Sequence, residues 1–363
     1  MSLELQTELL GHTLQSPLIL GSGPLSYSAD GIIRAHRAGF GAVTTKTIRD
    51  ETAINPFPHI ALSGKDTMIN AEKWSDLPAE QWIEEEIPEA KKSGVTLICS
   101  IGHTPEEVKH WIVPVDKAGA DIIELVSYLP ETIVPMTVKA KELTTRPVIV
   151  KLSPNWHDPV GMAKAVLEAG ADGITAMDSV GPVLRIDIRT ARPMVGGERG
   201  YGWLTGSAIK PIVLRYVAEI AALSNKPIIG MGGIMTAEDV IEMFMVGATH
   251  VGLCTAPILR GLEYIGKLHR GIARLLNDLG YVALADVRGV ALKNLPQKEI
   301  ADKFNFKFDR DACNSCMRCV QVCPYQARAL SKDLEMELNE DLCRYCGLCT
   351  TVCKPGALRG EFT

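Results

Sequence analysis

Short apolar runs recur along most of the chain, and each ends in a polar or glycine-rich stretch that a helical pattern follows. Runs of four or five β-branched and apolar residues are too short for helices and are typical of strands buried in a parallel sheet. Eight runs have this form: Leu18–Gly21, Ala42–Lys46, Leu97–Ile101, Asp121–Leu125, Val148–Leu152, Gly173–Met177, Pro227–Gly230 and His250–Leu253. The pattern therefore predicts strands that alternate with helices.

The segments between the runs carry helical patterns, such as Pro159–Ala169 and Ala237–Val246. Three similar phrases precede strands, namely Lys117–Asp121, Glu168–Asp172 and Met245–Thr249, and each has a glycine where a helix C-cap is expected. Eight β/α units in about 250 residues indicate an α/β fold of the (β/α)8 TIM-barrel type. A doubly wound sheet is the alternative, but the order of the units gives no sign of a reversal.

Two further patterns lie outside the eight units. Two apolar runs, Leu5–Leu10 and Thr13–Pro17, flank a glycine and predict a small hairpin that closes the bottom of the barrel. Near Lys303–Asp309 the composition shifts toward charged and aromatic residues, so we place a domain boundary at residue 305. We therefore expect a barrel over residues 1–305 and a small α+β domain over residues 306–363.

Composition and charge exclude several classes of protein. The 363 residues are 46% apolar and 22% charged, which is ordinary for a globular chain and excludes a disordered or fibrous one. A net charge of −5 leaves no basic excess for nucleic acid. Apolar runs fall short of the ~18 residues of a membrane span, and Met1–Gln6 lacks the basic start of a secretion signal. We expect a cytoplasmic protein that contacts neither nucleic acid nor membrane.

Eight of the ten cysteines lie in two runs near the end of the chain. The runs have the same spacing: Cys313-x-x-Cys316-x-x-Cys319-x-x-x-Cys323 and Cys343-x-x-Cys346-x-x-Cys349-x-x-x-Cys353. This spacing is typical of bacterial ferredoxins with two 4Fe–4S clusters, in which the fourth cysteine of each run serves the other cluster. We therefore assign one cube to Cys313, Cys316, Cys319 and Cys353, and the other to Cys343, Cys346, Cys349 and Cys323. The alternative is zinc, but zinc sites use two pairs of ligands and do not explain the third and fourth cysteines.

The candidate site in the barrel consists of the residues that follow the strands, because TIM-barrel enzymes work at that end. Glycines follow the first, seventh and eighth strands, where bare backbone can approach a flat ring or surround a phosphate with N–H groups. Lys46 and Lys151 end the second and fifth strands and could sit beside the electron-rich edge of a flavin. The alternative for each lysine is a salt bridge to a carboxylate.

Several of these phrases resemble the FMN barrel of dihydroorotate dehydrogenases: Thr45–Thr47, Lys151–Asn155, Thr205–Pro211, Gly232–Ile234 and Cys254–Ala256. With the cysteine-rich tail, the chain is similar to the pyrimidine-reducing part of dihydropyrimidine dehydrogenase and to its bacterial iron–sulfur subunit. The resemblance implies an FMN whose phosphate lies on Gly206, Gly232, Gly233, Cys254 and Thr255. It also implies flavin contacts from Gly21, Ser22, Lys46, Thr47 and Lys151, with Asn70 as the best surviving substrate-facing amide.

The chain departs from the family pattern after the fourth strand. The family has Glu-Leu-Asn-x-Ser-Cys-Pro there, whereas this chain has Glu124–Pro130, which reads Glu-Leu-Val-Ser-Tyr-Leu-Pro. If the prolines correspond, the catalytic cysteine is replaced by Leu129 and a substrate-binding asparagine by Val126. Leucine cannot exchange a proton and valine cannot bind an amide, so we expect a substrate other than a pyrimidine. Only twenty residues separate Pro130 from Lys151, so the family's lid segment is deleted and the pocket is more open.

Other residues could replace the missing proton donor. Tyr128, Glu131 and Asp178 are candidates, and a tyrosine with a pKa near ~10 can serve as a general acid at neutral pH. We take Tyr128, Asp178 and Lys46 as the candidate catalytic residues, with packing on the rim as the alternative for the tyrosine and a structural carboxylate for the aspartate. His103 and His157 also follow strands. The loop after the sixth strand carries arginines that could clamp an anion or simply face solvent: Arg185, Arg189, Arg192 and Arg199.

Three functions remain open. The first is an FMN oxidoreductase that exchanges hydride with a small unsaturated, cyclic substrate and passes electrons through two 4Fe–4S clusters. The second is an electron-transfer subunit whose FMN is only a relay, and the third is a barrel without flavin. Gly21–Pro24 is not a dinucleotide fingerprint, so we expect an NAD(P)H- and FAD-binding subunit or a ferredoxin as partner, within an oligomer.

Overall fold

The computed structural model describes residues 5–299 and 304–362. The chain forms two compact units, Met1–Asn294 and Leu295–Thr363. The division falls ahead of residue 305, where the composition predicts the boundary. Along the described residues, no helix is long and apolar enough to cross a membrane.

A closed barrel of parallel strands is the core of the first unit, in the order β10-β15-β16-β3-β4-β7-β8-β9. Each predicted run forms one of its strands: β3 (Leu18–Leu20), β4 (Ala42–Thr44), β7 (Thr96–Ile101), β8 (Ile122–Val126), β9 (Val148–Leu152), β10 (Gly173–Ala176), β15 (Ile228–Met231) and β16 (His250–Leu253). The TIM barrel is confirmed, and the doubly wound alternative is wrong because the sheet closes on itself.

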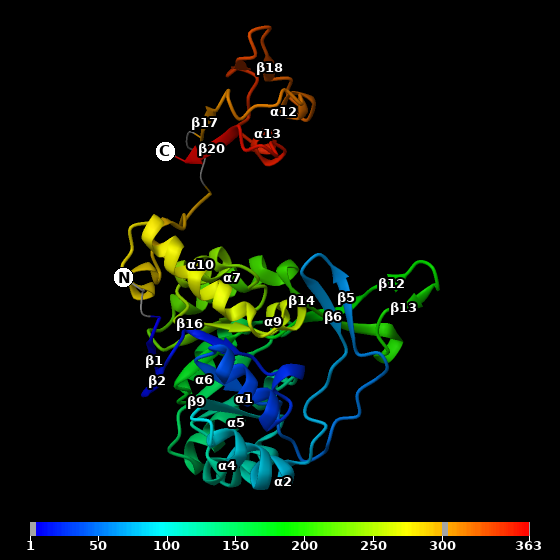
Figure 1. The fold of residues 1–363 in the computed structure, drawn as a ribbon, viewed down its shortest axis with the longest axis vertical. Helices are drawn as coiled ribbons and strands as arrows, with labels where there is room; N and C mark the ends of the chain where they lie inside the picture. The colour runs from blue at the N-terminus through cyan, green and yellow to red at the C-terminus, as the bar shows by residue number, and fades with distance from the viewer. Residues whose placement is uncertain (1–4, 300–303, 363) are drawn as a thin grey trace. The chain divides into compact units, whose positions relative to one another are not determined.

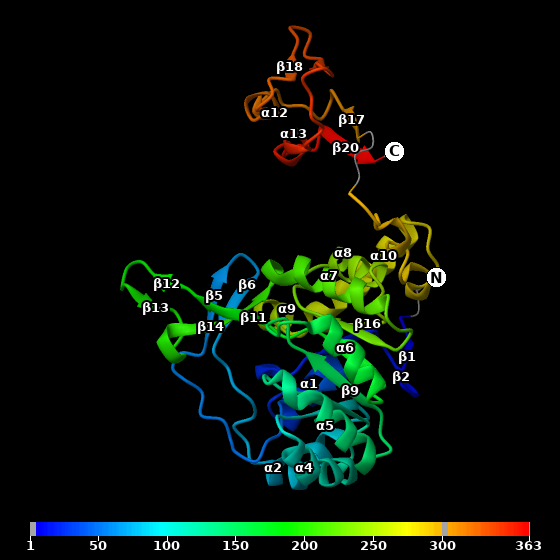
Figure 2. The ribbon, with the colours of Figure 1, turned by 180° about the vertical axis from the view of Figure 1, so that it is seen from behind.

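Helices surround the barrel, as Figures 1 and 2 show from opposite sides. They are α1 (Ala29–Ala38), α2 (Ala79–Gln81), α3 (Ile87–Lys91), α4 (Pro105–Ala118), α5 (Pro130–Leu143), α6 (Pro159–Glu168), α7 (Lys210–Ala221), α8 (Ala237–Met245), α9 (Thr255–Arg260), α10 (Tyr264–Asp278) and α11 (Leu284–Val287). The three glycines of the repeated phrases, Gly119, Gly170 and Gly247, have φ values of 125°, 102° and 108°. These left-handed conformations end the helices and confirm the predicted C-caps.

The predicted N-terminal hairpin consists of β1 (Thr7–Leu9) and β2 (His12–Leu14), paired antiparallel. Its Leu9 and Leu14 are fully buried in one apolar cluster with side chains from inside the barrel, including Ile122 at the start of β8. The hairpin therefore closes the barrel at the N-terminal ends of its strands. The opposite end stays available for a site.

A second, antiparallel sheet, which the hydrophobic pattern did not predict, covers that opposite end. Its strands are β5 (Ile60–Gly64), β6 (Thr67–Asn70), β11 (Val180–Leu184) and β14 (Tyr201–Gly206), in the order β11-β14-β6-β5. A small hairpin, β12 (Ile186–Asp187) with β13 (Arg192–Pro193), extends from it. The pairing of β6 with β14 places Asn70 opposite Trp203, so two distant loops form one wall of the barrel mouth.

The second unit is the predicted small α+β domain with two similar halves. Strand β17 (Phe304–Phe308) pairs with β20 (Leu358–Phe362), and β18 (Arg328–Leu330) pairs with β19 (Met336–Leu338). Short helices α12 (Arg318–Gln321) and α13 (Leu348–Thr351) each contain the third cysteine of a run. This arrangement confirms a ferredoxin-like region after the barrel.

Candidate functional site

The C-terminal ends of the barrel strands surround a cavity of about 1260 Å³, including its open mouth. Its place at the C-terminal ends of the strands is where TIM-barrel enzymes bind their ligands. The structure brings together twelve predicted residues along its lining: Ser22, Lys46, Thr47, Asn70, Tyr128, Lys151, Asp178, Gly206, Gly232, Gly233, Cys254 and Thr255. Gly21, predicted as a flavin contact, lies outside this lining, and its backbone N–H donates to the Leu253 carbonyl at 2.9 Å.

Three glycines give one side of the cavity a bare backbone. Gly206, Gly232 and Gly233 have φ values of 84°, 126° and 82°, which side-chain-bearing residues rarely adopt. A Cβ on Gly233 would lie 2.5 Å from the Cβ of Lys210, and one on Gly206 would lie 2.2 Å from the Asp66 carbonyl oxygen. Packing against neighbouring protein atoms therefore requires glycine at these positions. Their bare backbone lines the cavity, and the residues present fit a phosphate cradle.

The two predicted lysines both line the cavity and both face carboxylates. Lys46 Nζ donates to the Lys73 carbonyl at 2.6 Å and lies 3.2 Å from Glu72 Oε1. Lys151 Nζ lies 3.9 Å from Asp178 Oδ1, and its side chain is buried. The salt bridges considered as the alternative are therefore present, and both lysines also line the cavity.

A buried carboxyl group lies close to Lys151. Glu124 is 1% exposed; its Oε2 accepts a hydrogen bond from Thr175 at 2.8 Å, while Oε1 has no partner within the described residues. Burial raises the pKa of Glu124. Burial also opposes the charge of Lys151, but Asp178 and Glu124 outweigh it and raise the pKa of the lysine. The lysine is thus held as a cation by the carboxyl groups around it.

Aromatic side chains form part of the cavity wall. The Tyr128 and Trp203 rings are nearly parallel, at 13°, with centroids 6.4 Å apart. The His103 ring meets Tyr128 edge-on at 4.5 Å and Trp74 at 5.8 Å. Sequence reasoning missed both tryptophans because they come from distant loops; the only available signal was the position of Trp203 shortly before Gly206. This wall offers flat apolar faces to a planar ligand.

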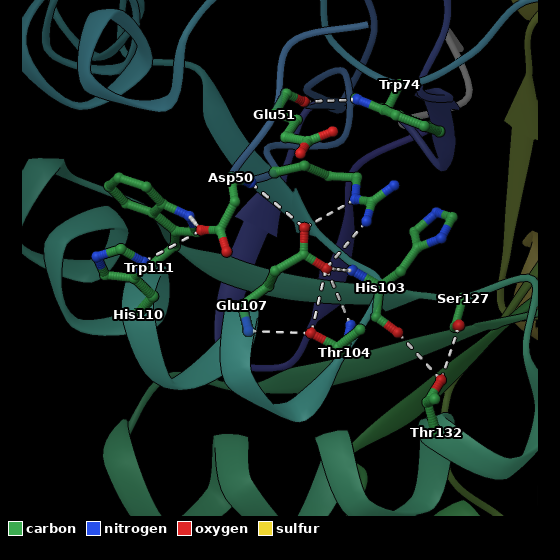
Figure 3. A network of polar contacts seen from close by, with 11 residues as sticks. Asp50, Glu51, Trp74, His103, Thr104, Glu107, His110, Trp111, Ser127 and Thr132 are labelled. Carbon is green, nitrogen blue, oxygen red and sulfur yellow. Dashed lines mark hydrogen bonds and ion pairs between the residues drawn. The ribbon is translucent and has the colours of Figure 1, made fainter.

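His103 is fixed in place through its backbone. Its N–H donates to Glu107 Oε2, and its carbonyl accepts a hydrogen bond from Thr132 at 3.0 Å (Figure 3). Glu107 also accepts from Arg49 Nε at 2.8 Å and completes the capping box of α4. Burial, with the nearby Arg49 charge, lowers the pKa of His103 to about 4. The imidazole is therefore neutral at physiological pH and is presented to the cavity by a rigid loop.

Of the two residues that replace family site residues, Val126 lines the cavity and Leu129 does not. Val126 lines the cavity, so an apolar side chain stands where the family pattern has an asparagine. Leu129, which precedes α5, and Tyr128 are similarly exposed, at 48% and 50%, but only Tyr128 belongs to the lining. Desolvation raises the pKa of the half-exposed Tyr128 to about 12, so its hydroxyl keeps its proton at neutral pH. Between Pro130 and Lys151 the chain forms only α5 and a short turn before β9, which leaves no room for a lid segment there.

The remaining candidates lie away from the cavity. Glu131 and His157 are outside its lining. A second cavity of about 1490 Å³ adjoins the first and shares Trp74, Tyr128 and Trp203 with it. Three of the loop arginines, Arg185, Arg189 and Arg192, are exposed and line neither cavity, whereas Arg199 lines the second.

The cysteines of the tail are grouped as the spacing predicts for the first cube. Cys313, Cys316, Cys319 and Cys353 line one cavity of about 400 Å³. Backbone N–H groups donate to the fourth cysteine of each run, from Ala327 to Cys323 Sγ at 3.4 Å and from Leu358 to Cys353 Sγ at 3.2 Å. Four thiols around one enclosed space, with N–H donors to sulfur, fit a 4Fe–4S cube.

Known protein families match both the barrel and the cysteine-rich tail. The family model described as dihydroorotate dehydrogenase matches residues 4–276, and models of a 4Fe-4S binding domain match residues 305–327 and 336–359. The chain is 33% identical over 306 residues to a dihydroorotate dehydrogenase B (NAD(+)) catalytic subunit of Pyrococcus abyssi, covering 80% of this chain and 99% of that protein. The catalytic subunit of the same name from Geobacillus kaustophilus is also 33% identical, over 80% of this chain and 96% of its own.

Proposed function

The chain belongs to the dihydroorotate dehydrogenase family, and from this premise we propose that it is an FMN- and iron–sulfur-dependent oxidoreductase acting on CH–CH groups. The observation that carries the proposal is the single cavity on which the glycine cradle and both strand-end lysines meet. The two 4Fe-4S motifs add one-electron carriers to a barrel of a redox family.

We propose that the cavity holds FMN. Gly206, Gly232 and Gly233, with Cys254 and Thr255, would bind its phosphate, and bound FMN supplies hydride exchange with a substrate carbon. Lys46 and Lys151 would lie beside the ring, with Gly21, Ser22, Thr47 and Asn70 completing the contacts. Lys46 lies 3.2 Å from Glu72, and Asp178 helps to hold Lys151 as a cation. A fixed cation beside a ring that gains electrons stabilises the reduced form.

We propose a flat, unsaturated cyclic substrate other than a pyrimidine. Val126 offers no hydrogen bond to a ring amide, and a site without such bonds loses its selectivity for amide substrates. The parallel rings of Tyr128 and Trp203 favour an aromatic or conjugated ring, because stacked rings gain about 0.5–1.5 kcal/mol beyond their burial. The adjoining second cavity leaves room for a substituent larger than a pyrimidine carries.

We propose Tyr128 as the group that gives the substrate its proton. Its phenol lines the cavity and remains protonated, because desolvation raises its pKa to about 12. Asp178 would act through Lys151, and Lys46 through the flavin, so both would position charge rather than move the proton. The neutral His103 beside Tyr128 is the second candidate, since an imidazole can accept the proton in the reverse direction.

Electrons must reach the flavin from elsewhere, so we propose an oligomeric, cytoplasmic complex with an NAD(P)H- and FAD-binding subunit or a ferredoxin. The relatives are named as catalytic subunits, which supports a second subunit. The alternative, favoured by Val126 and Leu129 in place of the family's residues, is a subunit whose FMN only relays electrons.

One experiment separates these functions. The full chain is purified without oxygen and reduced, and flavin absorbance is followed while conjugated cyclic ketones, cyclic imides and pyrimidines are added singly. We expect reoxidation by a conjugated ring compound in the absence of any other protein. Reoxidation only by an added electron-transfer protein would instead support the relay, and protein without FMN would exclude both.

A further inference from the structure

The two halves of the tail differ at one buried position. The cysteine runs repeat with an offset of thirty residues, so Cys323 corresponds to Cys353, and the same offset pairs Arg328 with Leu358. Each residue begins a strand, and the two are 6% and 2% exposed. Leucine is common at such positions, whereas a buried arginine is rare unless it is paired. The repeat therefore places a cation in one half where the other half has an aliphatic side chain.

Leu358 shows which cube its position faces. It lines the cavity of the first cube, together with the cysteines of that cube, and its N–H donates to Cys353 Sγ. In the other half, the residue before Arg328 donates its N–H to Cys323 Sγ at 3.4 Å. The internal repeat therefore places Arg328 against the second cube, which is held by Cys343, Cys346, Cys349 and Cys323.

Direct contacts support this placement. The guanidinium carbon of Arg328 lies 4.1 Å from the centroid of the Phe306 ring. That ring is nearly parallel to Tyr345, at 14° and 6.0 Å between centroids. Tyr345 lies between Cys343 and Cys346 in the sequence and donates its N–H to Cys343 Sγ at 3.4 Å. Arg328 is thus linked through two stacked rings to the cysteines of the second cube.

The Arg328 guanidinium has unsatisfied hydrogen-bond donors within the described part of the chain. Its Nε and Nη2 are buried and have no hydrogen-bond partner among residues 5–299 and 304–362, and no carboxylate in those ranges forms an ion pair with it. Leaving a buried cation uncompensated is strongly unfavourable. A cube with four thiolates carries negative charge, and one-electron reduction increases that charge. An anionic cube beside Arg328 would supply the missing compensation.

We propose that Arg328 makes the two cubes unequal, so that the second cube accepts the first electron. A buried cation stabilises the more negative, reduced state, and net charge around a cube is one of the properties that set its reduction potential. The step transfers one electron from the reductant to the cube, with no proton moved and no bond broken. The inference rests on the proposed clusters, but not on FMN or on the substrate.

The test is a redox titration of the full chain, purified and titrated with dithionite under argon and followed by electron paramagnetic resonance. Arg328→Leu copies the other half of the repeat, Arg328→Lys keeps the charge, and Arg328→Gln removes it with a polar side chain. Arg359→Leu is the matched control, because Arg359 is exposed on the same tail and water screens its charge.

We expect wild type, R328K and R359L to show one cube reduced before the other. In R328L and R328Q the reduced-to-oxidised ratio of the second cube at fixed potential should fall at least tenfold, which is about 59 mV for one electron. If R328L does not assemble its clusters, the comparison of R328Q with R328K decides. Unchanged titrations in variants that hold full iron would overturn the role of Arg328 alone, whereas iron-free wild-type protein would overturn the proposed function.

Discussion

Replacing Gly233 by alanine should release FMN, because the backbone there leaves no space for a side chain. A Cβ would lie 2.5 Å from Cβ, 2.6 Å from Cα and 2.7 Å from the backbone N of Lys210. Lys210 cannot easily withdraw, since it begins α7 and its Nζ donates to Asp239 and Glu242 at 2.6 Å each. The loop that carries Gly233 must therefore move away from its place at the cavity.

The cost has two parts. A φ of +82° costs a non-glycine residue about 1–2 kcal/mol, and overpacking adds about 1–3 kcal/mol. If the loop escapes this strain by leaving the cradle, FMN affinity falls by a factor between about 30 and about 4000, at ~1.4 kcal/mol per tenfold. Gly94→Ala is the matched control, because Gly94 has a φ of +81° with nothing within 4 Å of the added Cβ.

The assay is FMN binding to protein stripped of flavin, followed by quenching of flavin fluorescence, with melting temperature measured in parallel. We expect G233A to bind FMN weakly and G94A to bind it as wild type does, with both melting below wild type. Wild-type affinity in G233A, with a melting temperature equal to that of G94A, would refute the cradle.

Three further predictions concern the proton donor, the first cube and the buried histidines. Tyr128→Phe should lower kcat by about 10²–10⁴-fold at unchanged flavin content; a loss below twofold in stopped-flow flavin reoxidation would exclude the phenol as donor. Cys353→Ala should remove about four of about eight iron atoms per chain and leave the cube that includes Cys323; full iron in a colorimetric assay would contradict the crossed assignment. Burial lowers the pKa of His103 and His250 to about 4 each, below the unfolded value of ~6.5. Between these two pH values the unfolded state binds more protons than the folded state. The free energy of unfolding should therefore fall as pH drops from about 6.5 to about 4, by about 3 kcal/mol per histidine. Urea unfolding followed by tryptophan fluorescence reports the barrel alone, because all five tryptophans lie in that unit; His250→Gln should make this pH dependence shallower, and an unchanged slope would contradict it.

The barrel could be predicted because its strands are buried on both faces. A strand such as Val148–Leu152 is then continuously apolar until its last residues, and the run is visible without any knowledge of its neighbours. The antiparallel sheet could not be predicted in this way. Strand β11 alternates half-buried and exposed residues, and its partner β14 follows only after the intervening hairpin. Such a pattern of apolar and polar residues is too similar to that of a surface loop to predict a strand.

The candidate site was predictable where one strand end supplies the residue. Lys46 and Lys151 line the cavity, but the sequence left open whether carboxylates face them, because Glu72 comes from a separate loop. The aromatic wall was not predictable, since Trp203 reaches the mouth only through the pairing of β14 with β6. Aligning Pro130 with the family's proline identified the altered loop. The sequence did not show that Tyr128 lines the cavity while the adjacent Leu129 does not.

The central claim is that the barrel holds a flavin and the tail holds two iron–sulfur cubes. The most direct measurement is the flavin, iron and sulfide content of the full chain purified without oxygen, with the flavin identified by mass after extraction. The account predicts about one FMN and about eight iron atoms per chain. Protein that carries the iron but no FMN would contradict the assignment of the barrel, and protein with neither would contradict the whole account.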